Sequence, residues 1–197
     1  MRWRLWTSSP RASARLWGYR ASPGTPRVPG APRAPLWPPC GRGEPDGSAR
    51  IVEVGDKEVT GREATAECRF IASPEALRAL LHGTPKGDPL EAAKVAGLMG
   101  AKRTPDLLPF CHPIAITGAT VTLEADAEAG SIVVRARVKA NDRTGVEMEA
   151  LTAAVVAALS LYDTAKAYDR AARIDGVHLV EKSGGRSGHY VADPART

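Results

Sequence analysis

The chain has 197 residues, of which 43% are hydrophobic and 25% charged, with a formal net charge of +5. No run approaches the ~18 apolar residues of a membrane-spanning helix, so the sequence predicts no contact with a membrane. Its cysteines, Cys40, Cys68 and Cys111, are odd in number and lack a CxxC spacing. They indicate neither a disulfide framework nor a zinc knuckle and fit a reducing cytosol or organelle matrix.

The positive charge lies in the first 50 residues. These contain nine Arg, two acidic residues, all four Trp and nine of the 16 Pro, whereas residues 51–197 contain 18 basic and 20 acidic residues. The first segment has no apolar period of a helix or a strand, which is typical of a disordered or removable segment. We therefore expect residues 1–49 to be a dispensable extension and residues 50–197 to form one folded domain.

Two origins fit this extension. Its Arg-rich, acid-poor composition resembles a transit peptide, although its proline content disfavours a long amphipathic helix. It also lacks Lys, Asn, Ile and Phe, as GC-rich DNA does when it is translated upstream of a true start. We favour the second origin and a cytoplasmic location. A transit peptide would place the protein in the mitochondrial matrix.

The expected domain begins with a strand and two helices. Residues 65–72 alternate as a strand does, and Ser73-Pro74-Glu75 then supplies an N-cap, a first-turn proline and a first-turn acid for a helix ending near Gly83. After a turn, the stretch Asp88-Pro89-Leu90-Glu91 resembles a capping box with Asp in the cap position. It opens a second helix that reaches about Lys102.

The second half predicts a hairpin, a helix and a strand. A turn over 104–109 leads to two alternating runs at 114–124 and 131–139. A long helix follows at 146–168, and then a short strand at 177–180. The order β-α-α-β-β-α-β predicts an α+β fold with helices on one face of an antiparallel sheet, close to a ferredoxin-like arrangement.

The helix at 146–168 is apolar nearly all round, yet it carries Glu147, Glu149, Asp163 and Lys166. Glu149 and Asp163 are 14 positions apart, which places them some 40° apart around the axis but roughly 21 Å apart along it. One helix cannot bring both to one small ligand. Either two sites exist, or a second subunit completes each site.

These charged residues have alternative interpretations. Asp163 and Lys166 match a surface salt bridge. Their apolar surroundings also support a buried lysine with a depressed pKa, or an aspartate held by that lysine, and such groups suit acid–base chemistry. Glu147 and Glu149 also suit the helix dipole. Cys111 and His112 lie between prolines ahead of a strand, either as a polar site or as ordinary core and turn residues. A metal site is less favoured, because adjacent residues seldom ligate one ion.

Three basic clusters lie beside Gly or Pro turns, at 86–88, 102–104 and 182–188. Each alone fits a solvated turn, a helix end or a flexible tail. Together, in a domain of net charge −2, they indicate a local anionic ligand such as a phosphate. A nucleic-acid surface would need a broadly basic face with exposed aromatic residues.

Seven motifs in order resemble one family. They span about 52–188 and read VEVGDKEVTGREA, KGD, KVAGLMGAKRT, LPFCHP, RTGVEMEALTAA, LYDTAKA and EKSGGRSG. The chain resembles the molybdenum cofactor biosynthesis C (MoaC) family of cyclic pyranopterin monophosphate synthases. The resemblance implies a ferredoxin-like subunit in a homo-hexamer, a trimer of dimers with active sites at subunit interfaces.

The resemblance also implies a reaction. The family converts 3′,8-cyclo-7,8-dihydroguanosine 5′-triphosphate to cyclic pyranopterin monophosphate and pyrophosphate without a redox cofactor, and the resemblance implies no metal-ligating residue. A radical SAM GTP cyclase of the same pathway is the implied functional partner. Asp163, Lys166 and Lys86 match the catalytic positions. Matching substrate-binding positions are Cys111, His112, Pro113, Met148, Glu149, Arg62, Lys102 and Arg103.

The sequence departs from the family pattern at a few positions, which are Glu53, Thr164, Ala165 and Arg186. Arg186 replaces a lysine, and a planar guanidinium does not reproduce a compact ammonium. Two other functions compete with the synthase. One is a non-catalytic scaffold that binds a nucleotide or pterin, and the other is nucleic-acid binding through residues 1–50, which we rank last.

Overall fold

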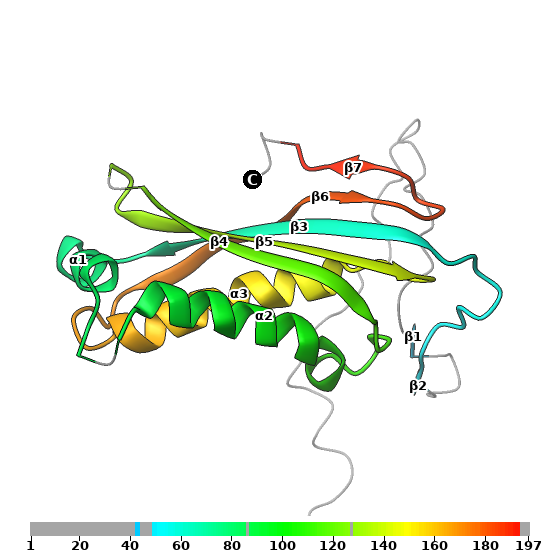
Figure 1. The fold of residues 1–197 in the computed structure, drawn as a ribbon, viewed down its shortest axis with the longest axis horizontal. Coiled ribbons are helices and arrows are strands. Elements are labelled where there is room, and N and C mark those ends of the chain that lie inside the picture. The colour runs from blue at the N-terminus through cyan, green and yellow to red at the C-terminus, as the bar shows by residue number, and fades with distance from the viewer. Residues whose placement is uncertain (1–41, 44–48, 86, 127, 194–197) are drawn as a thin grey trace, which may run out of the picture. The chain divides into compact units, whose positions relative to one another are not determined.

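The computed structural model describes residues 42–43, 49–85, 87–126 and 128–193, all within one compact unit, Pro39–Thr197 (Figure 1). The predicted extension therefore lies outside the described residues except for Arg42, Gly43 and Ala49, which lie in two short strands. These are β1 (Arg42–Gly43) and β2 (Ala49–Arg50), which pair antiparallel.

The main sheet has five strands in the order β4-β5-β3-β6-β7, with every neighbouring pair antiparallel. Its strands are β3 (Thr60–Ile71), β4 (Ile116–Asp126), β5 (Ser131–Asp142), β6 (Arg173–Ser183) and β7 (Tyr190–Val191). The predicted α+β fold with an antiparallel sheet is confirmed, and so is the order of its long elements.

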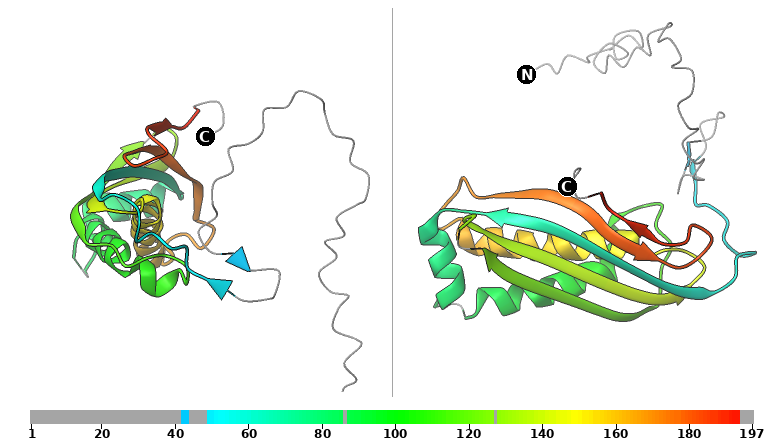
Figure 2. Two further views of the ribbon diagram at one scale, coloured as in Figure 1. Left: turned by 90° about the vertical axis from the view of Figure 1, so that its right-hand side faces the viewer. Right: turned by 90° about the horizontal axis from the view of Figure 1, so that it is seen from above.

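The three helices are α1 (Pro74–His82), α2 (Pro89–Leu107) and α3 (Glu147–Ala165). Helices α2 and α3 cover one face of the sheet, and α1 lies at one end of it, against α2 and α3 (Figures 1 and 2). Both predicted N-caps are confirmed. The Ser73 hydroxyl accepts from the Ala76 N–H at 3.3 Å, and the Asp88 carboxylate accepts from the N–H groups of residues 90 and 91. These caps satisfy N–H groups that the first turn of a helix leaves unpaired.

Several predicted boundaries are wrong. Helix α2 does not end near Lys102 but continues through Pro105 to Leu107, so much of the predicted turn at 104–109 is helical. Pro105 is tolerated because it lies in the last turn, where it removes only one helical hydrogen bond. Helix α3 ends at Ala165 rather than Tyr168. Strands β3 and β6 are longer than predicted, because pairing with neighbours holds polar residues in extended backbone.

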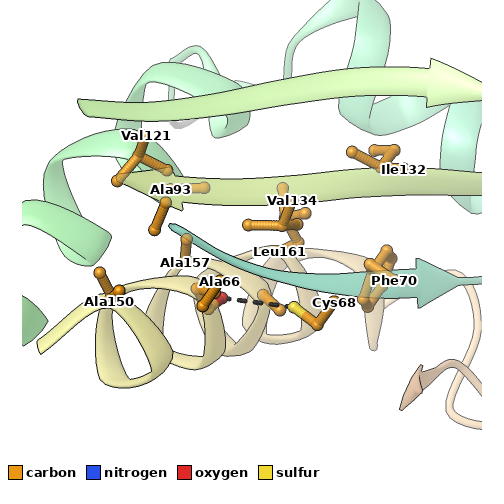
Figure 3. Packing of buried hydrophobic residues seen from close by; sticks show 14 of the residues in the cluster. Ala66, Cys68, Phe70, Ala93, Val121, Ile132, Val134, Ala150, Ala157 and Leu161 are labelled. Atoms are coloured by element: carbon orange, nitrogen blue, oxygen red, sulfur yellow. Dashed lines mark hydrogen bonds between the residues drawn. The ribbon is translucent and has the colours of Figure 1, made fainter. Parts of the chain in front are cut away.

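The core lies between the sheet and the helices. Alternate residues of β3 point inward, among them Cys68 and Phe70, which are fully buried (Figure 3). The Cys68 thiol donates to the Ala154 carbonyl oxygen at 3.5 Å, and burial raises its pKa to about 12, so it is an unreactive core residue. Helix α2 approaches α3 closely, since an added Cβ at Gly97 or Gly100 would lie 2.9 Å from α3 atoms.

Helix α3 is long and apolar enough to cross a membrane by length and composition alone. Packing explains its composition instead. Eight of its residues are buried, and it contacts β3, β5 and β6 as well as α2. A helix that packs on several sides at the centre of a domain has the same length and apolar composition as a helix that crosses a membrane.

Candidate functional site

Helix α3 carries polar groups at both ends of the domain. Because Glu147–Ala165 is one continuous α-helix, Glu149 and Asp163 are about 21 Å apart along its axis, as predicted. We call the groups at its start the N-terminal cluster; they are Arg62, Glu147, Glu149, Lys182 and Ser187. We call Asp163 with Lys166 the C-terminal pair.

Lys182 is at the centre of the N-terminal cluster. Its residue is only 9% exposed, and its ammonium donates to Glu147 Oε1 at 2.7 Å and to Ser187 Oγ at 2.9 Å. It pairs in register with Ala64, which is a buried residue of β3. A buried ammonium held by a carboxylate and a hydroxyl is able to position an anionic group or transfer a proton.

A β-bulge turns the Lys182 side chain inward. Leu179 of β6 pairs with Ala66, and Lys182 pairs with Ala64, so one extra residue lies between two inward positions. Strict alternation from Leu179 would have pointed Lys182 to the opposite face of the sheet. The alternation within the sequence therefore leaves Lys182 in a basic tail cluster and gives no sign of its burial.

Glu149 is the buried acid of the cluster. Its residue is 2% exposed, and its Oε2 atom has no hydrogen-bond partner among the described residues. Burial raises the pKa of Glu149 to about 7, and the charges of Glu147 and Asp142 act in the same direction, against a hydrogen bond from its own backbone. Near neutral pH this carboxyl exchanges a proton readily, as a general acid or base must.

Arg62 joins three segments around this cluster. Its Nε donates to the Asp142 carbonyl oxygen at 3.1 Å, and one Nη donates to the Arg143 carbonyl oxygen at 3.2 Å. Gly185, with φ of +71°, lies directly against the guanidinium, since a Cβ there would overlap it. Arg62 thus ties the start of β3 to the β5–α3 connection and to the loop after β6.

The Cys111-His112 segment lies just ahead of β4. His112 is half-buried, with Nε2 2.8 Å from the Val52 carbonyl oxygen, and the Cys111 N–H donates to the Leu108 carbonyl oxygen. Pro113 is exposed, and so is Met148 at 40% in the first turn of α3. No group of three His, Cys, Asp or Glu side chains in the described part of the chain is arranged to hold a metal ion.

The C-terminal pair is exposed, which corrects one prediction. Lys166 Nζ lies 2.6 Å from Asp163 Oδ1, and the two side chains are 55% and 73% exposed. The predicted buried lysine with a depressed pKa is wrong, because the hydrogen bond to Asp163 raises the pKa of Lys166. The buried face of α3 continues through Leu161 and Ala165, and the pair projects from the other side of the last turns.

The loop before α2 lies at the same end of the domain as the end of α3 (Figures 1 and 2). Lys86 is outside the described residues. Its neighbours form a tight turn in which Thr84 and Gly87 exchange backbone hydrogen bonds of 3.0 and 2.9 Å. A shallow open hollow beside this turn is lined by residues 81–85, 87 and 88.

Lys102 and Arg103 of α2 belong to neither the N-terminal cluster nor the C-terminal pair. Lys102 and Arg103 are exposed, and Arg103 forms an ion pair with Asp106 at 3.1 Å within the same helix. A surface pair of this kind contributes little to stability. The guanidinium nevertheless stays accessible to an anionic ligand.

Comparison with known proteins identifies the family. The MoaC family model matches residues 51–185, most of the described domain. The chain belongs to the MoaC family. Proteins named cyclic pyranopterin monophosphate synthase from Methylobacterium sp. (strain 4-46) and Parvibaculum lavamentivorans are each 51% identical to it, over 150 and 147 residues. These alignments cover 76% and 74% of this chain and 94% and 92% of the relatives.

A third relative with the same name, from Pelotomaculum thermopropionicum, is 52% identical over 145 residues, which are 73% of this chain and 85% of that protein. The MoaC-family match ends at residue 185, just beyond Lys182, and it includes both ends of α3. The family region therefore contains the N-terminal cluster except for Ser187, and all of the C-terminal pair.

Proposed function

We propose that this chain is a cyclic pyranopterin monophosphate synthase of molybdenum cofactor biosynthesis. It converts 3′,8-cyclo-7,8-dihydroguanosine 5′-triphosphate to cyclic pyranopterin monophosphate and pyrophosphate. Membership of the MoaC family and the names of relatives at about half identity support this activity. The observation that carries it is the buried Glu149, whose Oε2 atom has no hydrogen-bond partner among the described residues and whose pKa is raised to about 7. It lies at the same end of α3 as Glu147, which holds the ammonium of Lys182.

The active site is composite. Glu149 of the N-terminal cluster and Asp163 of the C-terminal pair lie about 21 Å apart along one continuous helix. A compact triphosphate substrate does not contact both across that distance. A second subunit that brings its C-terminal pair to the N-terminal cluster of the first completes the site. In the homo-hexamer, a trimer of dimers, each active site then lies at a subunit interface.

The catalytic residues are Asp163, Lys166 and Lys86, and they move protons during ring opening and pterin closure. The exposed ammonium of Lys166 keeps its proton through the hydrogen bond to Asp163, so it acts as an acid only once the substrate or the partner subunit displaces that carboxylate. Glu149 accepts or returns a proton near neutral pH.

The substrate-binding residues hold the triphosphate and the purine-derived ring. They are Cys111, His112, Pro113, Met148, Glu149, Arg62, Lys102 and Arg103. A ribose-derived oxygen attacks the α-phosphorus, forms the new ester bond and breaks the bond to the β-phosphate, which leaves as pyrophosphate. Cationic groups around the phosphates stabilise the charge that develops on the leaving group.

The protein acts in the cytoplasm on a small molecule that a radical SAM GTP cyclase supplies. Residues 50–197 form the catalytic domain, and residues 1–49 are dispensable for the reaction. No nucleic acid and no membrane take part. Within the described sheet, the arginines of β5 form ion pairs with acidic residues of β3, so this face offers no broadly basic surface to a nucleic acid.

One experiment tests the function. The purified full-length chain and its Lys166→Ala variant receive the cyclic dihydro-GTP substrate, and pyrophosphate release is followed together with pterin fluorescence after oxidation. We expect turnover by the parent and a loss of about 10²- to 10⁴-fold in the variant. Tight substrate binding without turnover by the parent would instead establish a non-catalytic scaffold.

A further inference from the structure

The Lys182 ammonium is held from two sides. Glu147 of α3 accepts one hydrogen bond, and the second acceptor is the hydroxyl of Ser187, in the loop that follows β6. Lys182 is nearly buried, whereas Ser187 is exposed. Glu147 supplies the countercharge, and Ser187 adds a neutral acceptor in a second direction. Two acceptors from different elements fix the direction of an otherwise rotatable ammonium.

The backbone of this loop is built to hold Ser187 in place. Gly184 and Gly185 have φ of +97° and +71°, a region that favours glycine, and the Gly188 N–H closes the turn on the Gly185 carbonyl oxygen at 3.2 Å. A Cβ at Gly184 would overlap the Gly61 carbonyl oxygen, so the loop lies directly on the start of β3. The turn therefore returns Ser187 to the ammonium five residues after Lys182.

We propose that Ser187 is a positioning residue that fixes the ammonium of Lys182 for contact with the substrate. This inference rests on the proposed function. Ser187 itself binds no phosphate and transfers no proton; it acts through Lys182. Without its hydroxyl, the ammonium keeps its ion pair with Glu147 but loses the acceptor in the second direction, and it meets the substrate in a less favourable geometry.

The test compares Ser187→Ala with Ser187→Thr, which retains a hydroxyl, and uses the exposed Ser183→Ala as a matched control on the same segment. Steady-state turnover of the cyclic dihydro-GTP substrate and thermal unfolding are measured for each full-length protein. We expect Ser187→Ala to lower kcat about tenfold with KM changed far less and Tm unchanged. Ser187→Thr is expected within about threefold of the parent, and Ser183→Ala equal to it.

A double-mutant cycle with Lys182→Met separates positioning from an independent role. Ser187→Ala is expected to cause no further loss in the Lys182→Met background, because its effect acts through that ammonium. Parent-like activity of Ser187→Ala, an equal loss in Ser187→Thr, or an undiminished extra loss beside Lys182→Met would overturn the inference. An inactive parent would overturn the proposed function, and this inference with it, whereas an active parent with a parent-like Ser187→Ala overturns the inference alone.

Discussion

The two ends of α3 differ in how completely one chain builds them. At its start, Lys182 and Glu149 are buried, and side chains from β3 and the β6 loop fix their surroundings. At its end, Asp163 and Lys166 are exposed and bonded to each other. The first set is therefore preorganised within one chain, and the exposure of the second set is what we expect if, as proposed, a partner subunit completes its environment.

The largest effect is expected from the exposed end. Lys166→Ala and Asp163→Asn should each lower kcat/KM by about 10²- to 10⁴-fold, because each removes a group that we propose transfers protons. Neither change should alter the stability of the isolated subunit by more than about 0.5 kcal/mol, since both side chains are exposed. Parallel assays of turnover and urea unfolding check this, and parent-like turnover would remove the pair from the mechanism.

At the buried end of α3, the expected effect is on the stability of the fold and its dependence on pH. The pKa of Glu149 is raised in the folded state, to about 7 from 4.5, so the folded protein holds this proton more tightly than the unfolded chain does. Stability therefore falls as pH rises from about 4.5 to about 7, by about 3 kcal/mol. Glu149→Gln should lack this fall.

Urea unfolding of the parent and Glu149→Gln at pH 5 and pH 8 measures this difference. We expect the variant to gain stability relative to the parent at pH 8 and much less at pH 5. The same relative stability at both pH values would show that the Glu149 pKa is not raised by burial.

The loop that completes the buried end provides a smaller test. Gly185→Ala places a Cβ on the Arg62 guanidinium at a positive φ, which should cost about 1–3 kcal/mol and displace Ser187. Gly176→Ala, also at positive φ but with open space around its added Cβ, is the control for backbone strain alone. A loss of turnover confined to Gly185→Ala supports the contact with Arg62, and equal losses in both would contradict it.

The smallest effect concerns the loop beside the exposed end. Asp88 caps α2 through two backbone N–H groups, so Asp88→Ala should cost about 1 kcal/mol of stability, and Asp88→Ser should restore most of it. Thermal unfolding checks the cap. If Asp88→Ser matches the Ala variant in Tm, the cap contributes nothing.

Local signals in the sequence predicted the elements well. The caps at Ser73 and Asp88 are hydrogen bonds between residues two or three positions apart in the sequence. The separation of Glu149 from Asp163 follows from helix geometry alone. Alternation in the hairpin likewise gave β4 and β5 to within a few residues. Properties of one element at a time were therefore predictable.

Properties that depend on two elements were not. The inward turn of Lys182 follows from a bulge against β3, which no pattern within β6 reveals. Apolar neighbours predicted burial of Lys166, but the sheet and α2 cover only one side of the last turns of α3. Pairing with a distant strand decides the burial of Lys182, and packing on one side only decides the exposure of Lys166.

The most direct test of the composite site is subunit mixing. We expect Glu149→Gln chains and Lys166→Ala chains each to be inactive or nearly so alone. The two are co-expressed with different tags and purified through both. If each site takes its Glu149 and its Lys166 from different subunits, random assembly should restore about a quarter of the parent activity. Mixed assemblies no more active than either variant alone would show that one subunit supplies both residues, and would contradict the account.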